Sequence, residues 1–161
     1  MLLEDNQALI EELAALRQRL LEAGLEPPRI LEGGELTPNF SVWEFACNDG
    51  TPVPDAALPG LRRLCQDVLQ PLRDRFGTCH VTSGFRTEAY NAAVGGATAS
   101  FHIYTLHLHE QAAAADVYFE SGSLSQWAGY ADQLLGGGGG VGAYPAQGFL
   151  HVDNGPRVWR Q

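Results

Sequence analysis

The histidines of this chain are unevenly spread, and their placement limits what the chain can fold into. Two segments hold the residues concerned: SFHIYTLHLHEQAAAADV, residues 100–117, with His102, His107, His109 and Asp116, and GFLHVDNG with His151 and Asp153. Two histidines and one carboxylate are the usual protein ligands of a hydrolytic zinc ion, whose fourth position is left for water. The fold must therefore bring two distant segments together, and we expect one of the earlier histidines to join Asp116 and His151 in binding Zn²⁺.

The segment FLHVD has the alternation of a strand. A period of two places Phe149, His151 and Asp153 on one face, and Leu150 and Val152 on the other. His151 would then face the same side as Asp153, as a metal ligand and its close neighbour should.

Four separated blocks of the sequence, in order, resemble the M15 family of zinc peptidases. They are VTSGFRTEAYNAAVGGATAS, Ser100–His102, Ala114–Asp116 and GVGAYPAQGFLHVDNGPRVW. The resemblance runs from about Leu36 to the end of the sequence, and the family includes D-Ala-D-Ala carboxypeptidases and L-Ala-D-Glu endopeptidases. It implies an M15/hedgehog-like fold. The order of expected elements, helices first and then a small, mainly antiparallel sheet, independently predicts the α+β class.

The first metal ligand has two candidates. The family pattern is S-x-H-x-x-G-x-A-x-D, and His109 has the required spacing to Asp116. His102 follows Ser100 and has family-like sequence on both sides, but it lies seven residues too far from Asp116. We favour His102, because loops between ligands tolerate insertions, and keep His109 as the alternative. His107 and His109 would then lie on a hairpin arm and face water.

The resemblance also implies roles for residues that do not bind metal. Arg86, in the segment SGFR, matches the arginine that the family uses near its zinc. A guanidinium there can hold a substrate carboxylate or stabilise the oxyanion of the tetrahedral intermediate. Ser83, Tyr90 and Asn91 match further family positions, either as substrate-binding residues or as braces of the loop.

The general base is the least defined part of the expected site. Many relatives place a Glu or Asp three residues before the last histidine, and Gly148 occupies that position here. Asp153 is the remaining carboxylate on the same face. It is either a catalytic residue or the partner that orients His151.

The resemblance implies a zinc metallopeptidase that cleaves the stem peptides of bacterial peptidoglycan with metal-activated water. The alternative is a virion structural or attachment protein that has an M15-like fold and binds the cell wall with little or no hydrolysis. The intact set of three ligands favours the enzyme, and the missing carboxylate before His151 favours the attachment protein.

The composition and charge of the chain restrict its expected binding partners and its expected cellular location. The formal net charge of −9 argues against nucleic acid, which needs a basic footprint, and no apolar run approaches the ~20 residues of a membrane span. The opening MLLEDNQ is acidic where a secretory signal is basic, so we expect no signal peptide. A wall-cutting protein of this kind would be phage-encoded and would reach the wall in a virion, or from the host cytoplasm upon lysis.

The N-terminal part reads as a separate module. The sequence predicts a coiled-coil helix over residues 1–24, a Pro/Gly linker over residues 25–35 and the peptidase domain over residues 36–161. The expected heptads place Asn6, Leu13 and Leu20 at a, and Leu2, Leu9, Leu16 and Ala23 at d. We therefore expect a parallel homo-oligomer, a dimer or a trimer, joined through residues 2–23, with other virion proteins as further candidate partners.

Within the domain, periodicity predicts a core-facing helix over 57–76 that Pro71 kinks or restarts, and another helix after an N-cap at Ser123. Strands are expected at 79–86, 113–119, 140–145 and 149–153. The run of five glycines from Gly136 to Gly140 predicts an irregular loop. The three cysteines have no metal-ligand spacing and are expected to be small buried residues.

Overall fold

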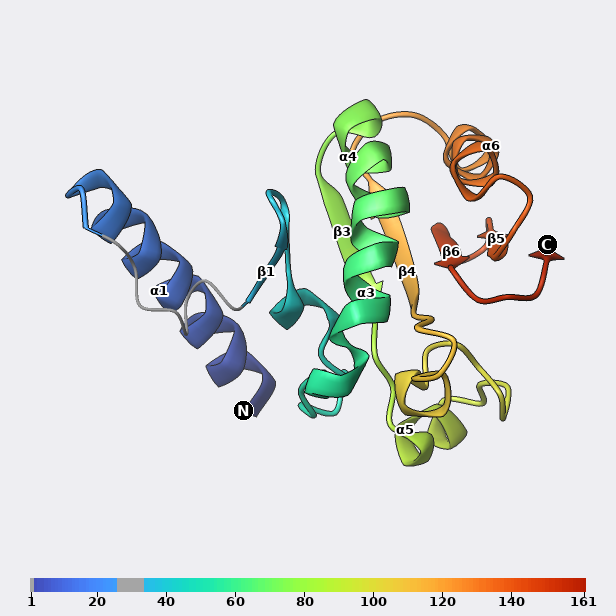
Figure 1. Ribbon diagram of the computed structural model, residues 1–161, viewed down its shortest axis with the longest axis horizontal. Coiled ribbons are helices and arrows are strands. Elements are labelled where there is room, and N and C mark those ends of the chain that lie inside the picture. Colours follow the sequence, from blue (N-terminus) through green and yellow to red (C-terminus); the bar gives the residue numbers. More distant parts are fainter. Residues whose placement is uncertain (1, 26–33) are drawn as a thin grey trace.

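The computed structural model describes residues 2–25 and 34–161, with the backbone alone for residues 2–7, 9 and 10 (Figure 1). The predicted linker, residues 25–35, lies mostly outside the described residues. None of the described helices combines the length and apolarity that crossing a membrane requires.

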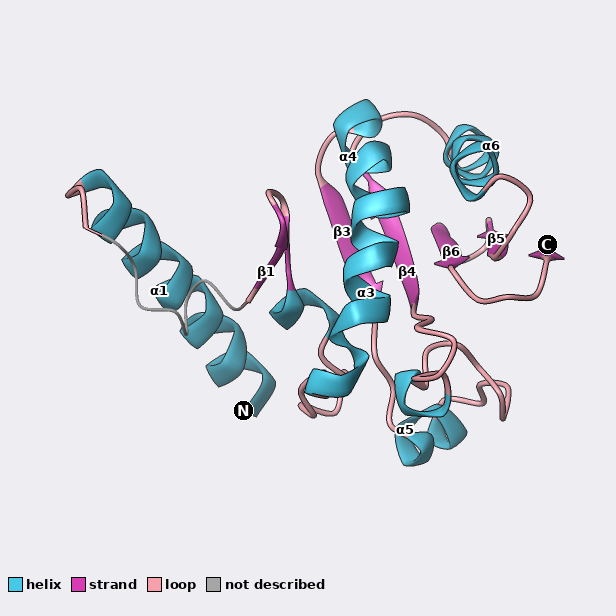
Figure 2. Cartoon of the chain, viewed as in Figure 1, coloured by secondary structure: helices cyan, strands magenta, loops and turns pink. Residues whose placement is uncertain are grey.

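A five-stranded sheet forms the centre of the domain, in the order β3-β4-β6-β5-β7. Its strands are β3 (Cys79–Ser83), β4 (Ala114–Phe119), β5 (Gly140–Tyr144), β6 (Phe149–Asp153) and β7 (Trp159–Arg160). All neighbouring strands are antiparallel except β5 and β7, which are parallel. A smaller hairpin pairs β1 (Glu35–Thr37) with β2 (Phe40–Ser41). The small, mainly antiparallel sheet with its helices has the predicted α+β architecture (Figure 2).

Helices cover one face of the sheet and build the core with it. They are α3 (Leu58–Leu64), the π-helical turn η3 (Cys65–Leu69), α4 (Gln70–Phe76) and α6 (Leu124–Leu135) (Figure 1). The predicted apolar stripe is buried, as Leu61, Leu64, Val68 and Leu72 show. The opposing strand residues are Val117, Leu150 and Val152, which belong to the same cluster. The alternate residues of β4 and β6 therefore point away from the helices.

Pro71 accounts for the π-helical turn in the long helix. It lies in the first turn of α4, directly after η3, and the Gln70 amide donates to the Cys65 carbonyl five residues earlier. Proline has no N–H and its ring clashes with the carbonyl four residues before it. The wider turn accommodates the ring, and the helix restarts and continues to Phe76.

Shorter elements complete the domain. They are the 3-10 turns η1 (Val42–Phe45), η2 (Asp55–Ala57) and η4 (Tyr104–Leu106), and the helix α5 (Glu88–Ala93). The predicted hairpin arm around His107 and His109 is wrong, because this segment forms η4 followed by turns. The predicted glycine loop ends one residue early, since Gly140 begins β5. All three cysteines are free and buried.

The N-terminal helix α1 (Leu2–Glu22) lies apart from the core (Figure 1). A salt bridge of 2.6 Å joins Arg17 Nη2 to Glu35 Oε2 at the start of β1. Leu16 and Leu21 expose 41% and 45% of their surface. These two leucines are therefore largely left in water by the single chain.

Candidate metal centre

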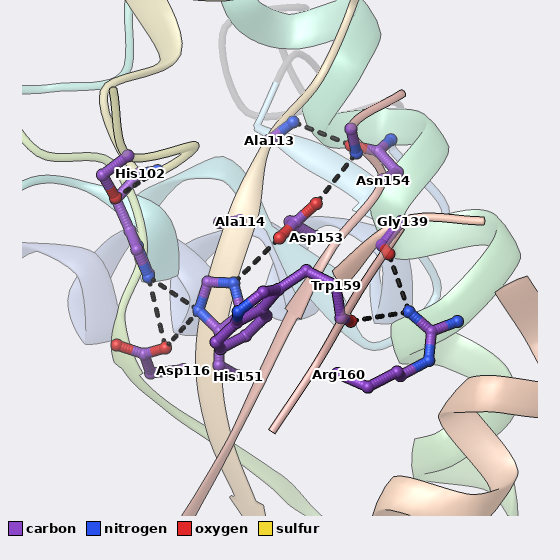
Figure 3. A network of polar contacts seen from close by, with 12 residues as sticks. His102, Ala113, Ala114, Asp116, Gly139, His151, Asp153, Asn154, Trp159 and Arg160 are labelled. Carbon is purple, nitrogen blue, oxygen red and sulfur yellow. Dashed lines mark hydrogen bonds and ion pairs between the residues drawn. The ribbon is translucent and has the colours of Figure 1, made fainter. Parts of the chain in front are cut away.

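Two neighbouring strands bring the second and third predicted ligands together. Asp116 on β4 is paired directly with His151 on β6, and Ala114 is paired with Asp153 two residues along. Side chains at directly opposed positions lie on the same face of a sheet. Asp116 and His151 therefore point together to the face that the helices leave uncovered (Figure 3).

The loop between α5 and η4 supplies His102. Its carbonyl accepts a 2.8 Å hydrogen bond from the Arg86 amide, and its ring Nδ1 lies 2.7 Å from the Gly84 carbonyl. A carbonyl can only accept, so Nδ1 carries the proton and the lone pair of Nε2 faces Asp116. Gly84 itself lies against the backbone of Phe45, where a Cβ would collide, so this position requires glycine.

The three ligand atoms converge on one point. His102 Nε2 lies 3.2 Å from Asp116 Oδ1 and 3.2 Å from His151 Nδ1, and the last two atoms are 2.9 Å apart. Zinc binds nitrogen and carboxylate oxygen at about 2.0–2.2 Å, which places tetrahedral ligands roughly 3.4 Å from one another. A small adjustment of these side chains therefore accommodates Zn²⁺.

A buried carboxylate orients His151. Its Nε2 lies 3.0 Å from Oδ2 of Asp153, whose side chain is 0% exposed and whose Oδ1 accepts from the Gly155 amide at 3.0 Å. Histidine ligands commonly donate their second nitrogen to such a partner, which fixes the ring. Gly140 on the neighbouring strand makes room, because a Cβ there would overlap the Asp153 carboxylate.

The two carboxylates beside His151 favour the protonated form of its ring. Burial would raise the pKa of Asp116, but the His102 and His151 imidazoles beside it outweigh burial and keep that pKa below its usual value. Burial would lower the pKa of His151, yet Asp116 and Asp153 raise it to about 9. A metal ion bound at Nδ1 has to displace this proton.

Arg86 lies beside the ligands and braces one of them. Its Nη2 donates to Asp116 Oδ2 at 3.1 Å and its Nε to Ser83 Oγ at 3.0 Å. Ser83 is thus a support for Arg86. Asn91 donates to the Ala97 carbonyl at 2.9 Å, and Tyr90 packs against the core, so both brace the loop and neither lines the cleft.

The other histidines of the sequence cluster lie outside this group. His107 donates from Nε2 to the Ser100 carbonyl at 3.1 Å, and its ring packs 4.1 Å from that of Phe101. His109 is exposed in a turn. Within the described residues, the one group that could hold a metal ion consists of His102, Asp116 and His151.

A cleft opens above the ligands, and much of its wall comes from residues that sequence reasoning missed. The lining residues are Arg86, Ala97, Ser100, Phe101, His102, Asp116, Tyr144, Phe149, His151, Arg157 and Trp159. Trp159 packs edge-on against His151, with ring centroids 5.5 Å apart (Figure 3). Gly142 leaves the space for this indole. The aromatic residues in the last family-like block of the sequence were the signal that could have indicated these cleft-lining residues.

Comparison with known proteins adds one match. The family model for Peptidase M15 matches residues 36–153, well over half of the chain and the part that contains all three converging side chains. No curated protein matches the sequence significantly.

Proposed function

The chain belongs to the peptidase M15 family, and from this premise we propose that it is a zinc-dependent peptidase acting on the stem peptides of bacterial peptidoglycan. One observation carries the proposal: His102, Asp116 and His151 each direct a ligand atom to a common point. Zn²⁺ held there supplies a Lewis acid and lowers the pKa of bound water toward ~7. The remaining chemistry belongs to the side chains around it.

Arg86 has two tasks in this proposal. Its hydrogen bond to Oδ2 of Asp116 orients the carboxylate so that Oδ1 faces the metal position. A guanidinium has five N–H donors, and Arg86 also lines the cleft, so its remaining donors can meet the oxygen of a substrate carbonyl as negative charge develops.

Asp153 acts in this proposal by positioning His151. A carboxylate without solvent exposure, already bonded to His151 and to the Gly155 amide, has no path to a substrate water. This favours the second of the two roles that the sequence allows for it.

The cleft also supports the second candidate function. Among the residues that the structure describes, Asp116 is the only acidic side chain in its lining, so no carboxylate is placed to act as the general base. An attachment protein that binds the wall through the cleft, with little or no hydrolysis, needs none.

Digestion of purified peptidoglycan separates the two functions. Zinc-loaded protein is incubated with the polymer, and new free amines and wall-bound protein are both measured. The peptidase releases amines, and His151→Ala abolishes the release together with tight zinc binding. Binding to the wall without new amines would establish the attachment function instead.

Arg86→Lys tests the arginine within the same assay. Lysine keeps the charge but loses the planar fork, so hydrolysis should fall about 100-fold or more while zinc is retained. Near-normal hydrolysis by Arg86→Lys would remove Arg86 from the mechanism.

A further inference from the structure

A second arginine, Arg157, faces the cleft without an acidic partner. Its guanidinium carbon lies 5.1 Å above the centre of the Phe101 ring, a cation–π contact, and the residue lines the cleft. Among the described residues no hydrogen bond or salt bridge joins it to another side chain. An arginine without an acidic neighbour, beside the candidate metal site of a chain with net charge −9, is free to bind an anionic ligand.

The loop that carries Arg157 is tied to the metal centre. The Gly155 amide donates to Asp153 Oδ1 at 3.0 Å, and Asn154 Oδ1 accepts from the Ala113 amide at 2.8 Å. Gly155 also lies against the Phe101 ring, where a Cβ would collide with it. Phe101 directly precedes His102, so the ring beneath Arg157 is attached to a metal ligand. The loop before Arg157 and the ring beneath its guanidinium are therefore both anchored at the candidate metal site.

The two arginines of the cleft are not equivalent. Arg86 uses Nε and Nη2 on Ser83 and Asp116, and its side chain is 17% exposed. Arg157 is exposed and keeps its donors for a ligand. A free guanidinium can bind a carboxylate with two parallel hydrogen bonds, and stacking on an aromatic ring orients its plane.

We propose that Arg157 binds a free α-carboxylate of the substrate, carried by the D-amino acid on the leaving-group side of the scissile bond. This inference rests on the proposed function. Two stem-peptide bonds share this chemistry: in D-Ala-D-Ala the last residue has a free α-carboxylate, and in L-Ala-γ-D-Glu the γ linkage leaves the α-carboxylate of D-Glu free. Phe101, Tyr144 and Phe149 supply apolar walls around the charge.

Matched pairs of peptides test the proposal with the zinc-loaded full chain. One pair is N-acetyl-D-Ala-D-Ala and its C-terminal amide. The other is N-acetyl-L-Ala-D-Glu whose γ-carboxyl is amidated, as a mimic of the γ linkage, and the same peptide with its α-carboxyl amidated as well. Dissociation constants are measured by calorimetry where a peptide is not cleaved, and KM and kcat where it is. The protein should prefer the acid of at least one pair by about 10–100-fold, the range of a hydrogen-bonded charge pair.

Arg157→Gln should bring this preference close to 1 and leave kcat within a few-fold, with unchanged zinc content. Arg63→Gln removes the same charge from an exposed position of α3 outside the cleft and should keep the full preference. Preference within the first pair identifies the terminal carboxylate as the group bound, and preference within the second pair identifies that of γ-linked D-Glu.

An unchanged preference in Arg157→Gln would overturn the inference, as would a wild-type protein that does not distinguish acid from amide in either pair. Failure of the proposed function looks different. Binding with a preference that depends on Arg157, but without cleavage of peptides or peptidoglycan, would refute the peptidase and leave the carboxylate site standing.

Discussion

At the level of single residues, each imidazole of the centre is held by the nitrogen that faces away from the metal position. His102 is anchored to the Gly84 carbonyl and His151 to the Asp153 carboxylate. Both anchors direct the other ring nitrogen inward, toward Asp116. The Gly84 carbonyl and the Asp153 carboxylate, which orient the two rings, are therefore as much a part of the centre as the ligands themselves.

The identity of the first ligand is the sharpest residue-level prediction. His102→Ala should abolish tight zinc retention, because two protein ligands rarely hold the ion. His109→Ala removes an exposed side chain and should retain about one zinc per molecule. Metal analysis after extensive dialysis compares the two variants. Loss of zinc from His109→Ala alone would show that spacing to Asp116, and not the flanking sequence, marks the ligand.

The role of Asp153 in orienting the His151 ring can be tested without removing a metal ligand. In Asp153→Asn only one side-chain oxygen remains for two donors, the His151 ring and the Gly155 amide. Zinc affinity should fall about 10–100-fold, the usual effect of losing such a partner. Competition with a chromogenic chelator measures it. Asp67→Asn, a change on the exposed surface of η3, serves as the control and should bind zinc as the wild type does.

His102, Asp116 and His151 could be predicted from the sequence as candidate ligands, but the residues that form the wall of the cleft could not. Asp116 and His151 belong to strands, where a period of two assigns each side chain to a face. Arg157 and Trp159 follow the last regular alternation, and their direction depends on a loop that tertiary contacts shape. The Asn154 side chain, for example, contacts Gly60 and Ala113, both far away in the sequence.

At the level of elements, the long helix and the strands were predictable because their apolar periods are long and regular. The segment 104–111 was not, since the alternation of Leu106 and Leu108 with two histidines imitates a strand. Its backbone hydrogen bonds run locally, such as those from Leu106 to Ile103 and from His107 to Tyr104, and leave no ladder to pair. Local turns therefore replaced the predicted hairpin arm.

The helix α1 carries a prediction of its own, namely that it joins chains into a parallel dimer or trimer. Leu16, at a predicted d position, is exposed in the single chain, and burying each such leucine between helices stabilises by roughly 1.5–3 kcal/mol. The competing contact to its own domain, Arg17–Glu35, is a partly exposed salt bridge, which contributes little. Light scattering of the full chain should give a multiple of the mass found for a chain beginning at Leu36.

Leu16→Glu is the matched variant, because it changes the expected interface and leaves the domain intact. It should shift the full chain toward monomer at micromolar concentration. Monomers for both the full chain and the chain beginning at Leu36 would contradict the coiled coil and assign α1 to a different role.

At the level of the whole molecule, the candidate metal centre joins the loop after α5 to the middle of the sheet. A ligand that binds only the folded state stabilises it by about 4 kcal/mol when present at 1,000 times its Kd. For a domain of this size, each kcal/mol shifts Tm by about 2–4 °C. Chelation of zinc should therefore lower the Tm of the wild type by roughly 8–16 °C in a thermal melt. Asp116→Ala should show no such response, and an equal shift in that variant would place the stabilising metal elsewhere.

The strand order β3-β4-β6-β5-β7 also has a consequence for how the protein is made. During synthesis β4 emerges with Asp116 in place, but its neighbour β6, which carries His151, follows only after α6 and β5 have been translated. Until then one edge of β4 is unpaired and the nascent chain has an incomplete ligand set. The candidate metal centre is therefore assembled late, and a chain truncated before residue 151 has an open sheet edge and lacks one of the three candidate ligands.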